Sequence, residues 1–335
     1  MKSVAVVAAN EVRVVDRPEP DAGGLALVRV ERTGICGTDL KVFHGSIPVD
    51  YPITMGHEMV GVVERPGPLG LVPAGTRVMI DPATSCGHCD LCRRGKLHLC
   101  RNGGLVGRDS DGFFAELVAV PEHRLHVVPE SISPDAASLL QVLGTCVHAQ
   151  RTVAVFPDQT AVVVGLGVSG LLHVQLLLAR GVKTVIGVTR SQWKLDLAAR
   201  FGAHAAVTPD DAARVVAEYT DGRGADLVVE AAGTEATLGQ SIALAGAAAS
   251  VVVFGTITSG SQGLPYYDLY FKELTITNPR AAGPDDYDTG IRLTADGRLD
   301  PAPLVTHVVA ADRPQDAIAA IDEAGSLKVV LDFTS

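Results

Sequence analysis

The sequence predicts an α/β protein, in which an irregular, mostly-β unit is joined to a doubly wound parallel sheet. Two patterns along its 335 residues indicate this. Up to about residue 145, short strand-like runs are separated by Pro and Gly, which is typical of an irregular all-β unit. From about residue 160, β-branched strands alternate with helical stretches, which is typical of a parallel sheet. Hydrophobic residues make up 47% of the chain and charged residues 20%, as expected for a globular protein.

The elements follow from these patterns in order. An opening strand is expected at residues 4–9, and further strands of the first part are expected at residues 25–30, 59–63, 77–80 and 115–120. In the second part, strands are expected at residues 160–164, 184–188, 226–230 and 250–254, and helices at 168–180, 192–201, 211–219 and 237–244. The tail from Pro284 should add two helical stretches and a closing strand at residues 328–333. We find no internal repeat and no low-complexity tract.

The charge of the chain excludes one class of partner. The formal net charge is -10, and the chain has no long block of Lys and Arg. An acidic protein repels phosphate backbones, so we expect no binding to nucleic acid. The single basic cluster, at residues 93–96, is short, and we interpret it as a solvated surface feature.

Two apolar runs could be mistaken for targeting or membrane segments. Residues 4–9 are too few for the core of a signal peptide with its cleavage site. Residues 161–179 are nearly long enough to span a bilayer, but Gly165, Gly167 and Gly170 interrupt them. We therefore expect a buried strand, a glycine turn and a buried helix there, and a protein of the reducing cytoplasm with no membrane association.

The glycines Gly165, Gly167 and Gly170 form a G-x-G-x-x-G motif between an expected strand and an expected helix. That context is the one a dinucleotide site requires. The first glycine permits a tight turn, the second lets the backbone approach a pyrophosphate, and the third lets helix and strand pack closely. The helix N-terminus would then offer unpaired N–H groups to the phosphates. The alternative is that these glycines serve helix packing alone.

The end of the next strand bears on the type of cofactor. NAD sites place Asp or Glu about 20 residues after the glycines, whereas this chain has Thr189 and Arg190. An Arg cannot accept from a ribose hydroxyl but can pair with a 2′-phosphate, which favours NADP(H). The alternative is that Arg190 lies along the adenine, which would permit NAD(H). We also expect Val168, Lys194 and Lys328 to contact the cofactor.

Four of the six cysteines lie within fifteen residues: Cys86, Cys89, Cys92 and Cys100. In a reducing compartment this spacing indicates a metal rather than disulfides. Four thiolates from one short segment can close a tetrahedral zinc site with no open position, so this zinc would be structural. A zinc ribbon for nucleic acid is the functional alternative, and the acidic charge argues against it.

A third group of residues is scattered: Cys36-Gly37-Thr38-Asp39 and Gly56-His57-Glu58. With the cysteine segment, the sequence D-G-F-F-A-E at residues 111–116 and the glycine motif, it makes the chain resemble the zinc-containing medium-chain dehydrogenase/reductase family along essentially its whole length. The resemblance implies a GroES-like catalytic domain at residues 1–145 and 283–335 and an inserted Rossmann domain at residues 146–282. It also implies a homodimer or homotetramer.

The resemblance further implies a catalytic zinc bound by Cys36 and His57, with Glu58 as a ligand in some states. Asp39 would hold the far nitrogen of His57. Thr38 would hydrogen-bond the substrate oxygen and pass its proton onward.

The chain departs from the family pattern at two positions. The family usually supplies a further Cys, Asp or Glu ligand where this chain has Gln141, whose amide oxygen is a weaker ligand. Many relatives have a His that ends a proton relay where this chain has Lys41, so Lys41 or solvent must serve. Cys146 is interpreted as a core residue, and His44 and His148 as structural.

These features together predict a dehydrogenase with two zinc ions per chain that interconverts a secondary alcohol and its ketone with a nicotinamide cofactor. Zinc would act as a Lewis acid, and the alcohol carbon would exchange a hydride with the nicotinamide. Aromatic residues are only 4% of the chain, which favours a polar substrate such as a polyol, sugar or aminocyclitol. The alternatives are a reductase of an activated double bond on the same scaffold, and a non-enzymatic zinc-stabilised binding protein.

Overall fold

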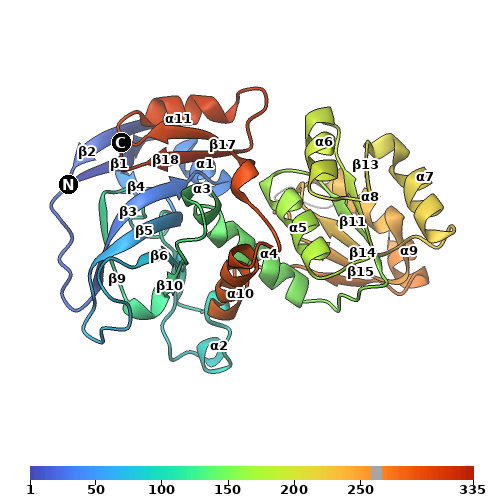
Figure 1. Ribbon diagram of the computed structural model, residues 1–335, viewed down its shortest axis with the longest axis horizontal. Helices are drawn as coiled ribbons and strands as arrows, with labels where there is room; N and C mark the ends of the chain where they lie inside the picture. Colours follow the sequence, from blue (N-terminus) through green and yellow to red (C-terminus); the bar gives the residue numbers. More distant parts are fainter. Residues whose placement is uncertain (258–265) are drawn as a thin grey trace. The chain divides into compact units, whose positions relative to one another are not determined.

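The computed structural model describes residues 1–257 and 266–335, which form two compact units (Figure 1). Unit 1 comprises Met1–Gly144 and Ala281–Ser335, and unit 2 comprises Thr145–Arg280. The boundaries expected from the sequence, 145/146 and 282/283, differ from these by one and two residues. Unit 1 is therefore built from both ends of the chain, and unit 2 is an insertion in it.

Unit 1 is mostly β-structure. Its strands are β1 (Lys2–Ala8), β2 (Glu11–Asp16), β3 (Ala26–Gly34), β4 (Ile53–Thr54), β5 (Glu58–Arg65), β6 (Arg77–Ile80), β7 (Ala83–Thr84), β8 (Gly104–Leu105), β9 (Leu117–Val120), β10 (Leu125–Val127), β17 (Val305–Ala310) and β18 (Lys328–Asp332). The largest sheet has the order β10-β6-β5-β3-β18-β17, with β9 also paired to β3. The C-terminal strand β18 runs antiparallel to β3, with Val330 opposite Gly34.

Short helices connect these strands. They are α1 (Gly37–Phe43), α2 (Asp90–Arg93), α3 (Pro134–Ala137), α10 (Pro284–Ala295) and α11 (Pro314–Ile321), with the 3-10 turns η1 (Leu97–Leu99), η2 (Glu122–Arg124) and η3 (Ala302–Leu304). Helix α4 (Leu140–Arg151) includes the first boundary between the units. Of these, α1 and α2 adjoin the two groups of metal-ligating residues described below.

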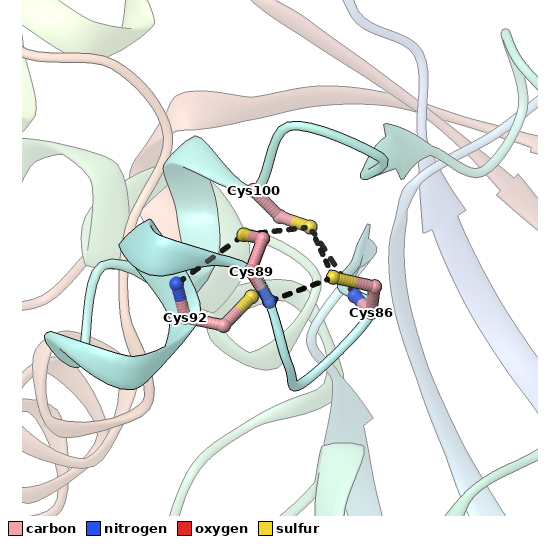
Figure 2. Close-up of side chains that lie close together, drawn as sticks. All are labelled: Cys86, Cys89, Cys92 and Cys100. Carbon is pink, nitrogen blue, oxygen red and sulfur yellow. Dashed lines mark hydrogen bonds between the residues drawn. The ribbon is translucent and has the colours of Figure 1, made fainter.

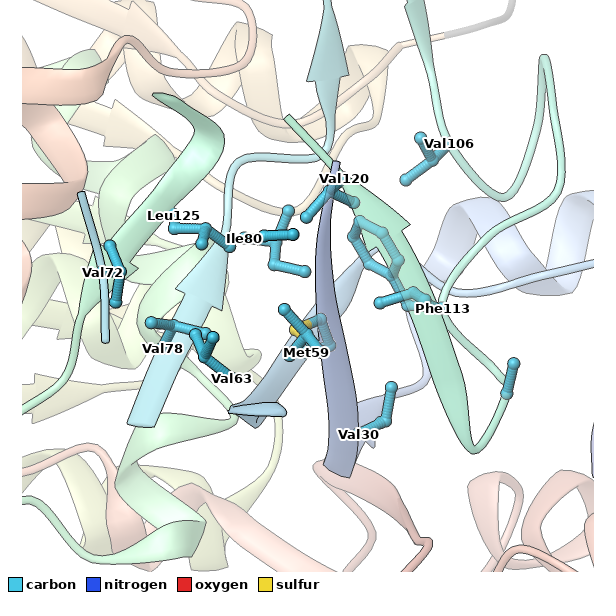
Figure 3. Close-up of a cluster of buried hydrophobic side chains, with 14 residues drawn as sticks. Val30, Met59, Val63, Val72, Val78, Ile80, Val106, Phe113, Val120 and Leu125 are labelled. Atoms are coloured by element: carbon cyan, nitrogen blue, oxygen red, sulfur yellow. The ribbon is translucent and has the colours of Figure 1, made fainter. Parts of the chain in front are cut away.

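Alternating residues of β3, β5 and β6 build a core of unit 1 (Figure 3). Val30, Met59 and Val78 each expose no more than 1% of their surface. Successive strand residues point to opposite faces of a sheet, so one residue in two faces this core. Burial of these side chains fixes the register of β3 and β5. It therefore also fixes the position of the loop that follows β3 and of the loop that precedes β5.

In the part of unit 2 that the structure describes, six strands form a parallel sheet with the order β13-β12-β11-β14-β15-β16. Its elements are β11 (Thr160–Val164), α5 (Val168–Ala179), β12 (Thr184–Val188), α6 (Gln192–Arg200), β13 (Ala205–Val207), α7 (Pro209–Thr220), β14 (Ala225–Glu230), α8 (Glu235–Leu244), β15 (Ala245–Val253), α9 (Tyr266–Phe271) and β16 (Thr275–Thr277). This order places the point at which the strand order reverses between β11 and β14, and dinucleotides bind at that point in such sheets.

The two faces of this sheet are covered by different helices. Val162 and Ile186 belong to an apolar layer with residues of α7 and α8. The neighbouring strand residues face the other way: Gly170 of α5 lies over Val163, and Ala198 of α6 lies over Gly187. Both faces are thus buried, which explains why β11 reads as a continuous run of apolar residues.

Three expected strands begin two or more residues from their expected positions, and the first of them, expected at residues 4–9, begins at Lys2. The strand expected at residues 115–120 begins at Leu117, because Ala115 instead forms an isolated bridge with Ser3. The strand expected at residues 250–254 begins at Ala245, within a stretch of Ala and Gly that has little strand propensity of its own. Within residues 1–257 and 266–335, no helix has the length and apolarity needed to cross a membrane.

Candidate active site and metal centres

Three residues expected to form a catalytic metal site lie together in unit 1. One ligand atom each of Cys36, His57 and Glu58 lies within 4.8 Å of the others. His57 and Glu58 are buried, and Cys36 is half-buried. Thiolate, imidazole and carboxylate are ligands of zinc in proteins. The donor set and its spacing therefore fit a zinc ion.

Asp39 fixes the two segments that carry these ligands. Cys36 is the N-cap residue of α1, and its backbone N–H donates to Oδ2 of Asp39 at 2.8 Å. The other carboxylate oxygen, Oδ1, accepts from the N–H of Gly56 at 3.1 Å. One fully buried side chain thus connects the loop after β3 to the residue that precedes His57.

Gly56 is required for the conformation of the second segment. Its φ of 94° is in the left-handed region, which side chains disfavour. A Cβ at this position would lie 2.1 Å from the ring of Phe114. The glycine therefore lets the chain turn closely over Phe114 and direct His57 and Glu58 towards Cys36.

The charges of the site also fit a cation. Burial alone would lower the pKa of His57, but the Asp39 carboxylate and the Cys36 thiolate raise this pKa more, so it lies well above its ordinary value. His57 Nδ1 lies 3.5 Å from Asp39 Oδ1 and makes no hydrogen bond within the described residues. A buried imidazole nitrogen that has no hydrogen bond and lies beside anionic groups can bind a metal ion. It can also accept a closer approach of Asp39, which would then orient the ring.

Lys328 lies beside this site in unit 1. Its Nζ donates to Oε2 of Glu58 at 2.6 Å and to the carbonyl of Ile35 at 3.0 Å. Burial lowers the pKa of Lys328, but the negative charges of Glu58 and Cys36 raise it more. A Cβ on Gly34 would lie 2.5 Å from Glu58 Oε2, so a glycine leaves room for the ion pair.

The remaining candidates of unit 1 occupy distinct surroundings. Thr38 and Lys41 are half-buried in α1. Gln141 is buried at the start of α4, close to the hydroxyl of Tyr287, which donates to Asp81 Oδ1 at 3.4 Å. No motif in the sequence pointed to Tyr287 as the neighbour of Gln141. His44 is exposed and pairs with Asn10.

The second group of metal-ligating residues consists of Cys86, Cys89, Cys92 and Cys100, whose sulfur atoms all lie within 4.8 Å of one another (Figure 2). The Sγ atoms of Cys86 and Cys100 are 3.5 Å apart, and those of Cys89 and Cys100 are 3.9 Å apart. Tetrahedral zinc with Zn–S bonds of about 2.3 Å separates its sulfur ligands by about 3.8 Å. The four side chains therefore fit a closed zinc site.

Backbone N–H groups prepare these sulfur atoms for negative charge. The N–H of Cys86 points at Cys100 Sγ at 3.2 Å, and the N–H of Cys89 points at Cys86 Sγ at 3.4 Å. Backbone N–H groups of Arg101 and Cys92 lower the pKa of Cys89 to about 6. Burial and the neighbouring cysteines raise the pKa of Cys92 to about 12. Such a split is expected where several thiols compete to ionise, and a bound cation would relieve it.

The glycine motif of unit 2 forms the expected turn between β11 and α5. Gly165 has a φ of 93°, and a Cβ on Gly170 would lie 1.8 Å from the carbonyl oxygen of Gly165. Gly167, the N-cap of α5, offers no side-chain cap, and a Cβ there would meet no atom within 4 Å. The N-terminus of α5, which begins at Val168, therefore has no side-chain cap, and the space beside Gly167 is open, as the approach of a pyrophosphate requires.

The residues expected to select the cofactor follow β12. The N–H of Gly165 donates to the carbonyl of Val188, so the turn and the end of β12 are neighbours. Thr189 is half-buried and Arg190 is exposed, and within the described residues Arg190 makes no ion pair and no side-chain hydrogen bond. Lys194 is half-buried, with its ammonium 5.3 Å from the centre of the Trp193 ring.

Comparisons with known proteins agree with this geometry. A family model described as an alcohol dehydrogenase GroES-like domain matches residues 22–130, and one described as a zinc-binding dehydrogenase matches residues 168–296. D-xylulose reductase A of Aspergillus oryzae is 30% identical to this chain, over 96% of this chain and 94% of that protein.

Solved structures include a Sinorhizobium meliloti 1021 protein described as a zinc-binding dehydrogenase bound to NADP, with a TM-score of 0.90 and 34% identity over 99% of this chain and 98% of that one. An Escherichia coli CFT073 alcohol dehydrogenase complexed with NADH has a TM-score of 0.90 and 28% identity, over 99% of each chain.

These similarities confirm the expected fold class and decide between an enzyme and a binding protein. The relatives are dehydrogenases and reductases, so the chain is an enzyme, and the non-enzymatic alternative is wrong. It is an alcohol or polyol oxidoreductase that uses zinc and a nicotinamide cofactor on a small alcohol or ketone. The chain belongs to the zinc-containing medium-chain dehydrogenase/reductase family.

Proposed function

We propose that this enzyme interconverts a polar secondary alcohol and its ketone, with NADP(H) as the preferred cofactor and two zinc ions per chain. The main support for this chemistry is that ligand atoms of Cys36, His57 and Glu58 lie within 4.8 Å of one another. A thiolate, an imidazole and a carboxylate form the donor set of an open, catalytic zinc site. A reductase of activated double bonds has no need of this set, so we favour alcohol chemistry.

The chain's own residues have separate tasks in this proposal. Cys36 and His57 would hold the zinc, which supplies a Lewis acid when bound. Asp39 keeps the two ligand segments together, and the Lys328 ammonium holds Glu58. Thr38 would bind the substrate oxygen and receive its proton, and Lys41 or solvent would carry that proton onward.

The substrate class is inferred from composition and from relatives. Aromatic residues are 4% of the chain, and a curated relative is named for a reaction of xylulose, a polyhydroxylated ketone. Both favour a polyol, sugar or aminocyclitol over a bulky apolar alcohol. Initial rates with such alcohols should exceed those with simple aliphatic alcohols of equal size. Equal rates for the two groups would remove the support for a polar substrate.

NADP(H) should be used more efficiently than NAD(H). Arg190 is exposed beside the glycine turn and has no partner within the described residues, so it can donate to a 2′-phosphate. A hydrogen bond to a charged group contributes about 1.5–3 kcal/mol, which is about one to two decades of affinity. Steady-state kinetics with both cofactors will measure this ratio.

The double variant Thr189→Asp, Arg190→Ala should reverse the preference, because a carboxylate repels the phosphate and accepts from the ribose hydroxyls. Lys183→Ala is a matched control, since it removes an exposed positive charge of the same unit at the opposite end of β12 from Arg190, and it should leave the preference unchanged. If the unmodified enzyme uses NAD at least as efficiently as NADP, Arg190 does not bind the 2′-phosphate.

The two zinc ions should differ in how readily a chelator removes them. Four thiolates hold the site of Cys86, Cys89, Cys92 and Cys100, whereas the other site has one thiolate and weaker ligands. Mild chelation should therefore abolish activity while about one zinc per chain and the circular dichroism spectrum are retained. A single zinc in the untreated enzyme, or loss of fold in step with loss of activity, would contradict this expectation.

A further inference from the structure

A buried carboxylate lies at the end of β14, next to the switch point of the parallel sheet. Glu230 is the last residue of β14, and its exposed fraction is 0%. Strand β14 pairs with β11, the strand that leads into the glycine turn. In sheets of this order, the crevice for a dinucleotide is formed by the loops that follow these two strands. Glu230 therefore stands at the base of one wall of that crevice.

The carboxylate holds the loop that forms this wall. Its Oε1 atom accepts from the N–H of Ala232 at 2.9 Å and from the N–H of Gly233 at 2.8 Å. The same oxygen accepts from the hydroxyl of Thr237, in the first turn of α8, at 2.7 Å. Three donors converge on one oxygen, so the path of residues 231–234 is fixed by this side chain.

Residues 231–234 pack so closely against the loops after β11 and β15 that the glycines of those loops leave no space for a side chain. A Cβ on Gly165 would lie 2.7 Å from the backbone nitrogen of Ala232. A Cβ on Gly255, which follows β15, would lie 2.3 Å from the backbone nitrogen of Gly233. The loops after β11, β14 and β15 thus touch through their backbones, and displacement of the middle loop would displace the glycine turn.

We propose that Glu230 is a positioning residue of the cofactor site, which acts by holding residues 231–234 against the glycine turn before the cofactor binds. A ligand that must order its own site binds less tightly than one that meets an ordered site, because part of its binding free energy is spent on that ordering. Loss of the Glu230 hydrogen bonds should therefore weaken cofactor binding without altering the metal sites of unit 1.

The test is a set of variants of the zinc-loaded enzyme, titrated with NADPH and with NADH by nucleotide fluorescence. Glu230→Ala should raise the dissociation constant of the preferred cofactor by about tenfold to a hundredfold. The value of kcat at saturating cofactor should change by less than about threefold, because the reacting groups are intact. Zinc content should remain as in the unmodified enzyme.

Glu230→Gln should restore most of the affinity. The amide oxygen can still accept from all three donors, and the amide nitrogen takes the place of Oε2, which accepts no hydrogen bond within the described residues. If Glu230→Ala does not fold, Glu230→Asp replaces it, since a side chain shorter by one methylene cannot reach the three donors and should show the same loss of affinity.

Glu122 provides the matched control. It is also a buried glutamate that holds a loop by two backbone N–H groups, those of Leu69 and Leu71, but it lies in unit 1. Glu122→Ala should lower Tm by an amount similar to that of Glu230→Ala and leave both dissociation constants unchanged. If Glu230→Ala lowers Tm but not cofactor affinity, or if Glu230→Gln loses as much affinity as Glu230→Ala, the proposal is wrong.

Discussion

Replacement of His57 or Cys36 by Ala is expected to lower turnover by about a thousandfold or more and to change cofactor affinity by less than about tenfold. Each residue contributes one ligand atom to the cluster of Cys36, His57 and Glu58. A Lewis acid lowers the activation free energy of such reactions by several kcal/mol. Each 1.36 kcal/mol of that lowering corresponds to a factor of ten in rate. The measurements are kcat with a reactive alcohol and the dissociation constant of NADPH.

The separation of the two effects follows from the positions of the residues. Cys36 and His57 belong to unit 1, whereas the glycine turn and Arg190 belong to unit 2. His44→Ala is the matched control, because His44 is an exposed histidine of unit 1 that pairs with Asn10. It should leave kcat unchanged. A loss of cofactor affinity as large as the loss of turnover would show that the two sites do not act independently.

Alanine at Gly170 and alanine at Gly167 should damage the protein in different ways. A Cβ on Gly170 would lie 1.8 Å from the carbonyl oxygen of Gly165, so the turn must shift. Overpacking of this kind costs about 1–3 kcal/mol, and we expect Gly170→Ala to lower both the free energy of unfolding and cofactor affinity. Denaturant unfolding and cofactor titration measure the two quantities.

Gly167→Ala tests the same turn without the clash. Gly167 has a negative φ of -75°, and a Cβ there meets nothing within 4 Å, so the free energy of unfolding should be nearly unchanged. The added methyl group would instead occupy the space where the pyrophosphate approaches the backbone, and cofactor affinity should fall by at least about tenfold. Unchanged cofactor affinity in Gly167→Ala would show that the cofactor does not approach this glycine.

The sequence predicted the central strands of unit 2 well because their signals are local. Strands β11 and β12 begin and end at the expected residues, since each is a short buried run between turns. Strands β13 and β16 were not predicted. Each has only three residues, and each is an edge strand defined by its hydrogen bonds to one neighbour, β12 or β15. Strand β17 was also missed, because it too depends on a partner, β18.

The candidate site shows the same division between local and distant information. Cys36 and the pair His57–Glu58 lie in short segments with characteristic glycines, and the structure brings their ligand atoms together. Lys328 is predicted to contact the cofactor, but the sequence did not indicate its hydrogen bond to Glu58, at a sequence separation of 270 residues. That contact depends on the antiparallel pairing of β18 with β3, for which the sequence near Lys328 contains no signal.

The same pairing has a consequence for synthesis on the ribosome. Glu58 emerges early, but the ammonium that neutralises it and the strand that completes the edge of β3 are translated 270 residues later. At about 5–20 residues per second, this separation corresponds to a delay of roughly 15–50 seconds. During that interval residues 32–34 of β3 lack their partner strand β18, and the carboxylate of Glu58 lacks its lysine. Unit 2, whose strands are contiguous in sequence, can fold while the N-terminal part of unit 1 still lacks β18.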